Sequence, residues 1–330
     1  MLKEDVLRSF AGRNVLITGG TGMIGREIVR IVSDAGAKVK IASLDRLVVD
    51  PRAEHVYADL RSFDTCRELT ADMDFVFHVA GIKGSVEVTK AKPASTFVPF
   101  LMMNTNVLEA ARLNGVKKLV YTSTIGTYAS AEVFSEDQYT ILSEPMDMFP
   151  GWAKRMAELQ CEAYLKQYGN AYFSVVRPCN VYGPGDNFDP ENAMVIPTLM
   201  SRIANGEKPV RIWGDGTAVR DFLYSRDAAE GCILALHHGT RGSFVNLGSG
   251  VGYSIRELVE GLRSFLEFEY EFDVTKPAGY PRRVMDMRRA KEWIDFEAET
   301  SLVDGLKGAW SWFMENRQEY LNRKNYWTES

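Results

Sequence analysis

A glycine-rich segment near the start of the chain has the spacing of a phosphate-binding turn. Residues 18–25 read TGGTGMIG and lie between a short apolar run and a stretch with helical periodicity. In that setting Gly19 and Gly22 let the backbone turn tightly and approach a pyrophosphate, and Gly25 lets helix and strand pack closely. The free N–H groups at the start of such a helix attract phosphate oxygens. The segment predicts a dinucleotide site formed by Gly19, Thr21, Gly22, Met23, Ile24 and Gly25.

The residues after the second predicted strand indicate which dinucleotide fits. An acid at this strand end binds the adenosine ribose hydroxyls of NAD, whereas a nearby arginine accommodates the 2′-phosphate of NADP. Ser43 stands at the expected position, followed by Asp45 and Arg46. Asp45 favours NAD, while Ser43 with Arg46 would suit NADP, so we expect NAD and keep NADP as the alternative. Asp59 and Leu60 are candidates for contacting adenine; alternatively, Asp59 caps a surface turn.

Apolar runs and helical stretches alternate over the first half of the chain. The predicted strands are Asn14–Thr18, Val39–Ala42, Phe75–Ala80, Lys118–Thr122 and Ser174–Arg177, and the predicted helices are Arg26–Ala35, Phe97–Asn114 and Gly151–Tyr168. Such alternation is typical of a parallel, doubly wound α/β sheet. Beyond Tyr182 we predict helices at Ile196–Asn205, Ser254–Phe265 and Ser301–Asn316, and short strands at Val210–Trp213 and Phe244–Leu247. We expect a Rossmann-type dinucleotide-binding domain over residues 1–180 and a smaller, interleaved α/β substrate-binding lobe over residues 181–330.

Composition and charge disfavour several other classes of protein. The 330 residues are 45% hydrophobic and 25% charged with a formal net charge of −5, so we expect no nucleic-acid or membrane-surface partner. No run approaches roughly 18 apolar residues, the length of a membrane span. The first ten residues lack an apolar core, and the cysteines lack C-x-x-C spacing. We therefore expect a cytoplasmic protein with reduced thiols and no metal.

Several short motifs fall in one order along the chain. They are TGGTGMIG at 18–25, ADL at 58–60, HVAG at 78–81, YTST at 121–124, the helix carrying Lys154, and RPCNVYGPGDNF at 177–188. Together they resemble the extended short-chain dehydrogenase/reductases, the NAD-dependent epimerase/dehydratase family of nucleotide-sugar enzymes. The second half is similar to the GDP-L-fucose synthases in GPGDNF at 183–188, VIP at 195–197, WGDG at 213–216 and RDFLY at 220–224. The resemblance implies a homodimer formed through the two long helices, Phe97–Asn114 and Gly151–Tyr168.

The resemblance assigns the catalytic roles to Thr124 and Lys154. In that family a Tyr exchanges a proton with the sugar oxygen as hydride moves, and the Lys binds the nicotinamide ribose and lowers the Tyr pKa. The Tyr stands four residues before the Lys, and here that position is Pro150, next to Phe149. Neither side chain carries a proton, so Thr124, a water or the sugar's own hydroxyls would have to replace the phenol. The further cofactor contacts implied are Ala80, Lys154, Asn180 and Tyr182.

Two further departures from the family narrow the expected chemistry. The dehydratases carry an acidic pair where this chain has Ile125 and Gly126, and the GDP-L-fucose synthases epimerise with a Cys and a His where it has Gly126 and Met194. We therefore expect an oxidoreductase that transfers hydride at C4 of the sugar. A 4-epimerase and a catalytically silent binding protein are the alternatives. Cys179 is a candidate surrogate acid, although a buried Cys usually packs as a small hydrophobe.

Arginines in the second-half motifs fall where the resemblance places cations around the substrate diphosphate. The planar guanidinium fork binds phosphate oxygens in pairs, and an exposed Trp can stack on a base. In the loop GIKGS, Lys83 and Ser85 are candidates for contacting the sugar. These features predict a GDP-linked nucleotide-sugar bound by Lys83, Ser85, Arg202, Trp213, Arg220, Arg282 and Arg283.

Overall fold

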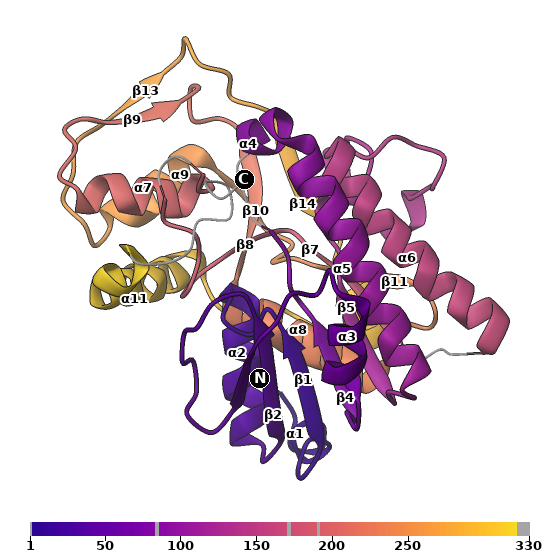
Figure 1. The fold of residues 1–330 in the computed structure, drawn as a ribbon. Helices are drawn as coiled ribbons and strands as arrows, with labels where there is room; N and C mark the ends of the chain where they lie inside the picture. Colours follow the sequence, from indigo (N-terminus) through magenta and orange to yellow (C-terminus); the bar gives the residue numbers. More distant parts are fainter. Residues whose placement is uncertain (1, 83–85, 170–172, 190–191, 322–330) are drawn as a thin grey trace.

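A parallel sheet forms the centre of the molecule in the computed structural model, which describes residues 2–82, 86–169, 173–189 and 192–321 (Figure 1). The seven strands lie in the order β11-β7-β5-β4-β1-β2-β3, and every neighbouring pair is parallel. They are β1 (Asn14–Thr18), β2 (Lys38–Ser43), β3 (Glu54–Tyr57), β4 (Phe75–His78), β5 (Lys118–Thr122), β7 (Phe173–Pro178) and β11 (Phe244–Leu247). The chain starts mid-sheet and winds first to one edge and then to the other, which confirms the predicted doubly wound fold.

Helices cover both faces of this sheet. One face carries α1 (Glu4–Arg8), α2 (Met23–Asp34), α8 (Ser225–His238) and α10 (Arg288–Ile294), and the other carries α3 (Phe63–Thr70), α5 (Pro93–Leu113) and α6 (Met148–Tyr168). Along β1, Val15 and Ile17 belong to the first apolar cluster and Leu16 to the second. Strand residues alternate between faces in this way, and a sheet buried on both faces needs apolar residues at every position.

A second lobe has its own strands and its own apolar core. Its strands are β6 (Val133–Phe134), β8 (Asn180–Tyr182), β9 (Val210–Trp213), β10 (Val219–Tyr224), β12 (Gly252–Ser254), β13 (Tyr270–Asp273) and β14 (Arg282–Met285). The helices around it are α4 (Val86–Ala91), α7 (Val195–Ala204), α9 (Ile255–Arg263) and α11 (Leu302–Leu321), and the 3-10 turns η1 (Ile125–Thr127) and η2 (Glu136–Gln138) lie between β5 and α6. In Figure 1 the strands β9 and β13 lie with α7, α9 and α11 on the side away from α6.

The structure details one sequence-based expectation and corrects another. The strand Phe244–Leu247, which lies in the second half of the chain, is β11 and pairs with β7 at the edge of the main sheet, so a single cut near residue 180 divides that sheet. The helix expected to begin at Gly151 begins at Met148, which makes Pro150 its third residue. A proline is tolerated there because the first four N–H groups of a helix have no intrahelical acceptor.

The described part of the chain also lacks the features that membrane spans, metal sites and disulfides require. None of its helices combines the length and the apolar character needed to cross a bilayer. In the same residues, no three His, Cys, Asp or Glu side chains are grouped so that they could hold a metal ion. The four cysteines are free thiols, and all of them are buried.

Candidate active site

The glycine-rich turn connects β1 to α2 at the carboxyl end of the sheet. Gly19 has a φ of +70°, a conformation that favours glycine. A Cβ on Gly25 would lie 2.3 Å from the Gly19 carbonyl oxygen, so glycine is required for α2 to approach the turn this closely. A Cβ on Gly22 would meet, among the described residues, only that oxygen, at 3.2 Å. The turn is therefore open on the side of Gly22, Met23 and Ile24, where the first N–H groups of α2 suit a pyrophosphate.

The second strand ends beside this turn with a carboxylate in place. The Thr21 hydroxyl donates to Asp45 Oδ2 over 3.1 Å, and Ser43 Oγ donates to the Asp45 carbonyl oxygen over 2.8 Å. Arg46 is exposed and lies over the Tyr57 ring, 5.4 Å from its centroid. The group suited to ribose hydroxyls is thus fixed at the glycine turn, and the cation suited to a 2′-phosphate stacks on a neighbouring ring. The site carries both groups, and the preference for NAD over NADP stays a prediction.

The other residues expected near the adenosine half lie at neighbouring strand ends. Ala80 follows β4 and touches the turn, because a Cβ on Gly19 would come within 2.7 Å of the Ala80 Cα. The Asp59 carboxylate accepts the backbone N–H of Arg61 at 2.9 Å and also binds its guanidinium. Leu60 is buried in the apolar cluster under α3. Asp59 therefore caps a turn, the alternative left open above, and its contact with adenine stays a prediction.

Lys154 is buried on α6 at the end of β5. Its Nζ donates to the Thr122 carbonyl oxygen over 2.6 Å and lies 5.2 and 5.3 Å from the ring centroids of Phe100 and Tyr121. Burial lowers the pKa of Lys154 to about 8, and the nearby Glu158 carboxylate acts in the opposite direction. A lysine held in this way can donate to ribose hydroxyls, the role that the resemblance implies.

A chain of buried polar groups connects the glycine turn to the residues around Lys154. The Thr18 hydroxyl contacts His78 Nδ1 at 2.8 Å, His78 Nε2 contacts Asn104 Oδ1 at 3.0 Å, and Asn104 Nδ2 donates to the Tyr121 hydroxyl over 3.0 Å. Burial, and then the charge of Lys154, lower the pKa of His78 to about 3. His78 is therefore neutral at physiological pH and acts as a fixed polar link. The HVAG motif marked its position in the sequence but not this contact.

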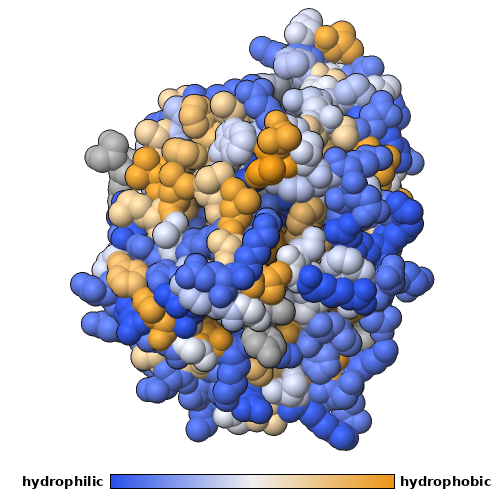
Figure 2. All heavy atoms as spheres, turned by 90° about the vertical axis from the view of Figure 1, so that its right-hand side faces the viewer, coloured by the Kyte–Doolittle hydropathy of each residue, from blue (hydrophilic) through white to orange (hydrophobic). Residues whose placement is uncertain are grey.

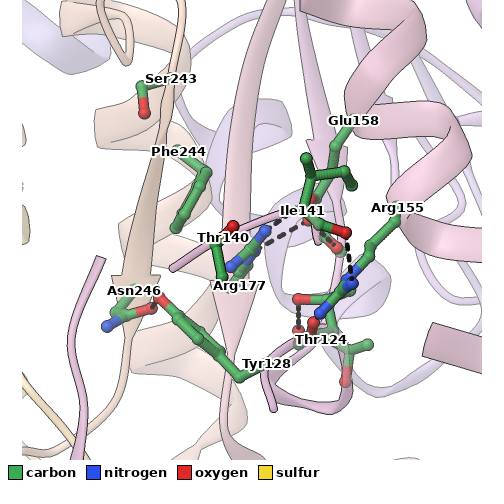
Figure 3. Close-up of polar contacts among 12 residues, drawn as sticks. Thr124, Tyr128, Thr140, Ile141, Arg155, Glu158, Arg177, Ser243, Phe244 and Asn246 are labelled. Atoms are coloured by element: carbon green, nitrogen blue, oxygen red, sulfur yellow. Dashed lines mark hydrogen bonds and ion pairs between the residues drawn. The ribbon is translucent and has the colours of Figure 1, made fainter. Parts of the chain in front are cut away.

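Thr124 caps the 3-10 turn that follows β5. Its Oγ1 accepts the Gly126 N–H at 3.2 Å, which leaves the hydroxyl proton free to be donated. Figure 3 shows Tyr128 in the same loop, pointing away to Asn246, whose Oδ1 accepts the Tyr128 hydroxyl at 2.8 Å. Burial raises the pKa of Tyr128. Phe149 at the helix start has no hydroxyl and that of Tyr128 is bound to Asn246, so neither aromatic residue offers a phenol to the site.

The loop carrying Thr124 is braced by α6. Figure 3 shows Arg155 reaching into it, where Nε donates to the Thr127 carbonyl oxygen over 2.7 Å. Arg177 on β7 is fully buried, and its Nε and Nη2 donate to the two Glu158 carboxylate oxygens over 2.9 and 2.5 Å. The hydroxyl of Ser123, directly before Thr124, donates to the same carboxylate. These contacts fix the backbone from which Thr124 projects.

The residues expected at the nicotinamide lie on and before β8. Asn180 Nδ2 donates to the Asp221 carbonyl oxygen over 2.9 Å, and the buried Tyr182 hydroxyl donates to the Leu302 carbonyl oxygen over 3.3 Å. The Cys179 thiol donates to Asp221 Oδ1 over 3.5 Å, and burial raises its pKa well above the ordinary value. A proton-donating role of Cys179 is therefore disfavoured, and the nicotinamide contacts of Asn180 and Tyr182 stay predictions.

Two arginines of the second lobe lie side by side. Arg220 on β10 and Arg283 on β14 are partners in a parallel register. Arg220 donates to the Tyr280 carbonyl oxygen over 2.6 Å, and the Arg283 guanidinium stacks 4.0 Å from the Tyr280 ring centroid. Burial and the charge of Arg283 lower the pKa of Arg220 to about 10, and the buried Arg283 Nε has no hydrogen-bond partner among the described residues. Adjacent cations with an unused donor favour an anion, and Arg282 adjoins them on β14.

The remaining predicted substrate residues are less closely grouped. Arg202 on α7 is engaged in an ion pair with Glu207, in which its Nε donates over 2.6 Å. Trp213 ends β9 with 53% of its surface exposed, so its ring is accessible for stacking. Lys83 and Ser85 lie outside the described residues. The pair Arg220 and Arg283 is thus the part of the predicted anion site that the structure brings together.

Asp147 also borders this site, although no motif in the sequence marks it. It is the N-cap of α6, yet its side chain makes no capping hydrogen bond. The carboxylate instead lies against Gly126, where a Cβ would come within 2.3 Å of Asp147 Oδ2. Burial raises the pKa of Asp147, while Arg283 and Lys90 act in the opposite direction. Gly126 is visible in the sequence, but its contact with Asp147 is set by the fold.

The buried ammonium of Lys154 predicts a pH dependence of stability. Its pKa is about 8 in the folded protein against an ordinary value of 10.5, so the unfolded chain binds more protons between these two pH values. Stability should therefore rise with pH across that window, by up to about 3 kcal/mol for this one group. We expect urea unfolding from pH 7.5 to 10.5 to show this rise in wild type relative to Lys154→Met. Parallel curves for the two proteins would contradict it.

The fold and the glycine turn define a class of protein, the doubly wound α/β proteins with a dinucleotide-type turn at the carboxyl end of the sheet. Comparison with known proteins then identifies the family. Residues 15–248 match the NAD dependent epimerase/dehydratase family. The chain belongs to this family, which confirms the predicted resemblance to the extended short-chain dehydrogenase/reductases and the prediction of an enzyme.

Individual relatives agree with this assignment. The chain is 32% identical to GDP-L-fucose synthase 1 of Arabidopsis thaliana over 92% of its own length and 93% of the relative's. It is 31% identical to GDP-L-fucose synthase of Escherichia coli, with 93% and 98% covered. Among solved structures, UDP-glucose 4-epimerase of Thermotoga maritima, determined with UDP-glucose, superimposes with a TM-score of 0.77 at 27% identity, covering 92% of this chain and 99% of that one. The relatives thus include enzymes of both GDP- and UDP-linked sugars.

Proposed function

We propose that this protein transfers hydride at C4 of a nucleotide-sugar, with a GDP-linked sugar as substrate and NAD as the preferred dinucleotide. When bound, the dinucleotide supplies or accepts the hydride. Lys154 holds the nicotinamide ribose, Thr124 donates a hydrogen bond to the reacting oxygen, and Arg220 with Arg283 binds the diphosphate. The similarity to GDP-L-fucose synthases over more than nine-tenths of the chain supports the GDP-linked substrate.

One observation supports this proposal, namely that Asp147 is near both the arginine proposed for the diphosphate and the turn that carries Thr124. The Asp147 carboxylate lies against Gly126, two residues from Thr124, and is also within electrostatic reach of Arg283. A sugar linked to a diphosphate at Arg283 would therefore extend toward Thr124 and Lys154. Because Gly126 and Met194 carry no group able to abstract a proton from carbon, redox chemistry at a single carbon suits these side chains best.

Single-turnover measurements test the proposed reaction. Purified protein is mixed with reduced or oxidised dinucleotide and a GDP-sugar or its 4-keto form, and the nicotinamide absorbance is followed. We expect a redox change that requires the GDP-sugar and is stronger with NAD(H) than with NADP(H). Conversion of the sugar to its C4 epimer without net redox change would identify the 4-epimerase instead. Absence of both reactions, with both ligands bound, would identify a silent binding protein.

The arginine pair gives a prediction for substrate affinity. Changing Arg220 or Arg283 to Ala removes charge-assisted hydrogen bonds to the diphosphate and should weaken GDP-sugar binding by about 1.5–3 kcal/mol. Dinucleotide binding should be unchanged. Arg211→Ala is the control, because Arg211 is exposed on β9 and pairs with Glu271. Calorimetry with both ligands measures these effects, and equal losses for both would show that the fold, rather than the anion site, was disturbed.

We also propose a homodimer formed through α5 and α6. Figure 2 faces the side of the molecule that carries these helices and shows apolar residues among the charged ones. The exposed apolar side chains of the two helices include Val98 (48%), Met102 (42%), Met156 (38%) and Leu159 (37%). We expect light scattering at micromolar concentration to give twice the mass of one chain, and Met156→Glu to give a monomer. A monomeric wild type would refute the proposal.

A further inference from the structure

We propose that Asp147 is the acid–base residue that exchanges a proton with the sugar oxygen at the reacting carbon. The inference rests on the proposed hydride transfer and names the group that replaces the phenol. It was not apparent from the sequence, because Asp147 and Gly126 are twenty-one residues apart and meet only in the folded chain.

The carboxylate is turned away from the place an aspartate normally takes at a helix start. Asp is among the favoured N-cap residues because its oxygen accepts an N–H of the first turn. Asp147 occupies the N-cap of α6 but makes no such bond, and its carboxylate lies over Gly126 instead. The backbone Asp147 N–H donates to the Gly126 carbonyl oxygen over 3.2 Å, which fixes the two segments together. The carboxylate therefore borders the same turn as the Thr124 hydroxyl.

Gly126 leaves room for the carboxylate. A Cβ on Gly126 would overlap Asp147 Oδ2, at 2.3 Å, so a side chain at position 126 and the carboxylate exclude one another. Pro150 stands one turn further along α6. Helical side chains lean toward the helix N-terminus, and proline puts no long side chain in that direction. Glycine at position 126 therefore keeps the space free for the carboxylate.

The surroundings suit a carboxyl that takes up and releases a proton. The charged groups that act on it are Arg283 from β14 and Lys90 from α4, and no described residue donates a hydrogen bond to it or forms an ion pair with it. Burial raises its pKa above the ordinary value of 3.8. The carboxyl therefore keeps its proton to a higher pH than an exposed aspartate, and that proton is not committed to another of the described residues.

The step is balanced with the dinucleotide as the redox partner. In the reductive direction the carbonyl carbon gains the hydride of the reduced nicotinamide, the C=O π bond breaks, and the oxygen takes the proton from Asp147. The ketone is thereby reduced to an alcohol, the nicotinamide is oxidised, and Asp147 is left as a carboxylate that solvent reprotonates. In the oxidative direction the carboxylate removes the hydroxyl proton as hydride leaves the carbon.

Two substitutions at one contact test the proposal. Asp147→Asn keeps the shape but cannot exchange the proton, and Gly126→Ala pushes the carboxylate out of place. Each should lower the single-turnover rate by about 10²–10⁴-fold, the range for general acid–base catalysis, while dinucleotide and GDP-sugar binding stay intact by calorimetry. The double variant should be no slower than Asp147→Asn, because both changes remove one function. Asp64→Asn, an exposed aspartate in the first turn of α3, is the control.

Two further readouts separate this role from a structural one. The reductive rate of wild type should fall as pH rises through the pKa of Asp147, and Asp147→Asn should lack this limb. Infrared titration of the protein without ligands should show one carboxyl band above the ordinary Asp range that disappears in Asp147→Asn. An inactive wild type would refute the proposed function. An active wild type matched in rate by Asp147→Asn would refute the role of Asp147. Exchange of solvent deuterium into a sugar carbon that depends on Asp147 would also refute it, because the carboxylate would then act on carbon and not on the oxygen.

Discussion

Arg177→Met should lower the free energy of unfolding by about 3–5 kcal/mol, the range for removing one partner of a buried ion pair. The Arg177 side chain is fully buried and that of Glu158 is 10% exposed. Methionine fills part of the volume between Tyr128, Tyr139 and Phe244, whose rings surround the guanidinium, but leaves the Glu158 charge without its partner. Since the same carboxylate accepts the Ser123 hydroxyl, the loss should also loosen the turn that carries Thr124.

Urea unfolding followed by circular dichroism measures this effect. Lys166→Met is the matched control on the same helix, because Lys166 and Glu162 form an ion pair with 75% and 46% of their side chains exposed. Exposed pairs contribute about 0–1 kcal/mol, so the control should unfold almost as wild type does. If Arg177→Met lowers the free energy of unfolding by less than about 1 kcal/mol, other groups must compensate the negative charge of Glu158. The double variant Arg177→Met with Glu158→Leu should recover much of the loss, since it leaves no unpaired charge.

The parts of the molecule that follow from local sequence were predictable. Gly19 and Gly25 mark the turn because each meets a local steric requirement, and the buried strands are marked by continuous apolar runs. The family resemblance then located Thr124 and Lys154. Thr124 follows β5 directly, and Lys154 on α6 donates to the carbonyl oxygen of Thr122, the last residue of β5. Their contacts with ligands stay predictions that the experiments above address.

The parts that depend on distant contacts were not predictable. β11 has the composition of any short buried strand, and its pairing with β7 follows from packing of α8 across the main sheet. Arg202 looked equivalent to Arg220, but a glutamate five residues later engages it. Asp147 was hidden for the same reason, because its role depends on Gly126. In each case the chemical group is visible in the sequence while its partner is set by the fold.

Gly22→Asp should weaken dinucleotide binding by about 4 kcal/mol, the interaction of two like charges roughly 4 Å apart at an effective dielectric of about 20. That corresponds to an approximately 10³-fold higher Kd. Gly22 is the N-cap of α2 with φ −75° and ψ 176°, a conformation open to any residue. Aspartate is a favoured N-cap, so its carboxylate would accept the N–H groups of α2 that the pyrophosphate needs. The variant should therefore fold as well as wild type and yet lose its cofactor.

Gly22→Ser separates charge from bulk in this test. Serine is also a favoured N-cap and adds a Cβ at the same place, but it has no charge to repel the pyrophosphate. Calorimetry with NAD(H) and NADP(H) should then rank wild type first, Gly22→Ser second and Gly22→Asp last, while thermal unfolding of the three proteins without ligand stays similar. Unchanged affinity in Gly22→Asp would show that the dinucleotide binds elsewhere. Equal losses in both variants would instead mean that a Cβ alone, 3.2 Å from the Gly19 carbonyl oxygen, blocks the approach of the dinucleotide.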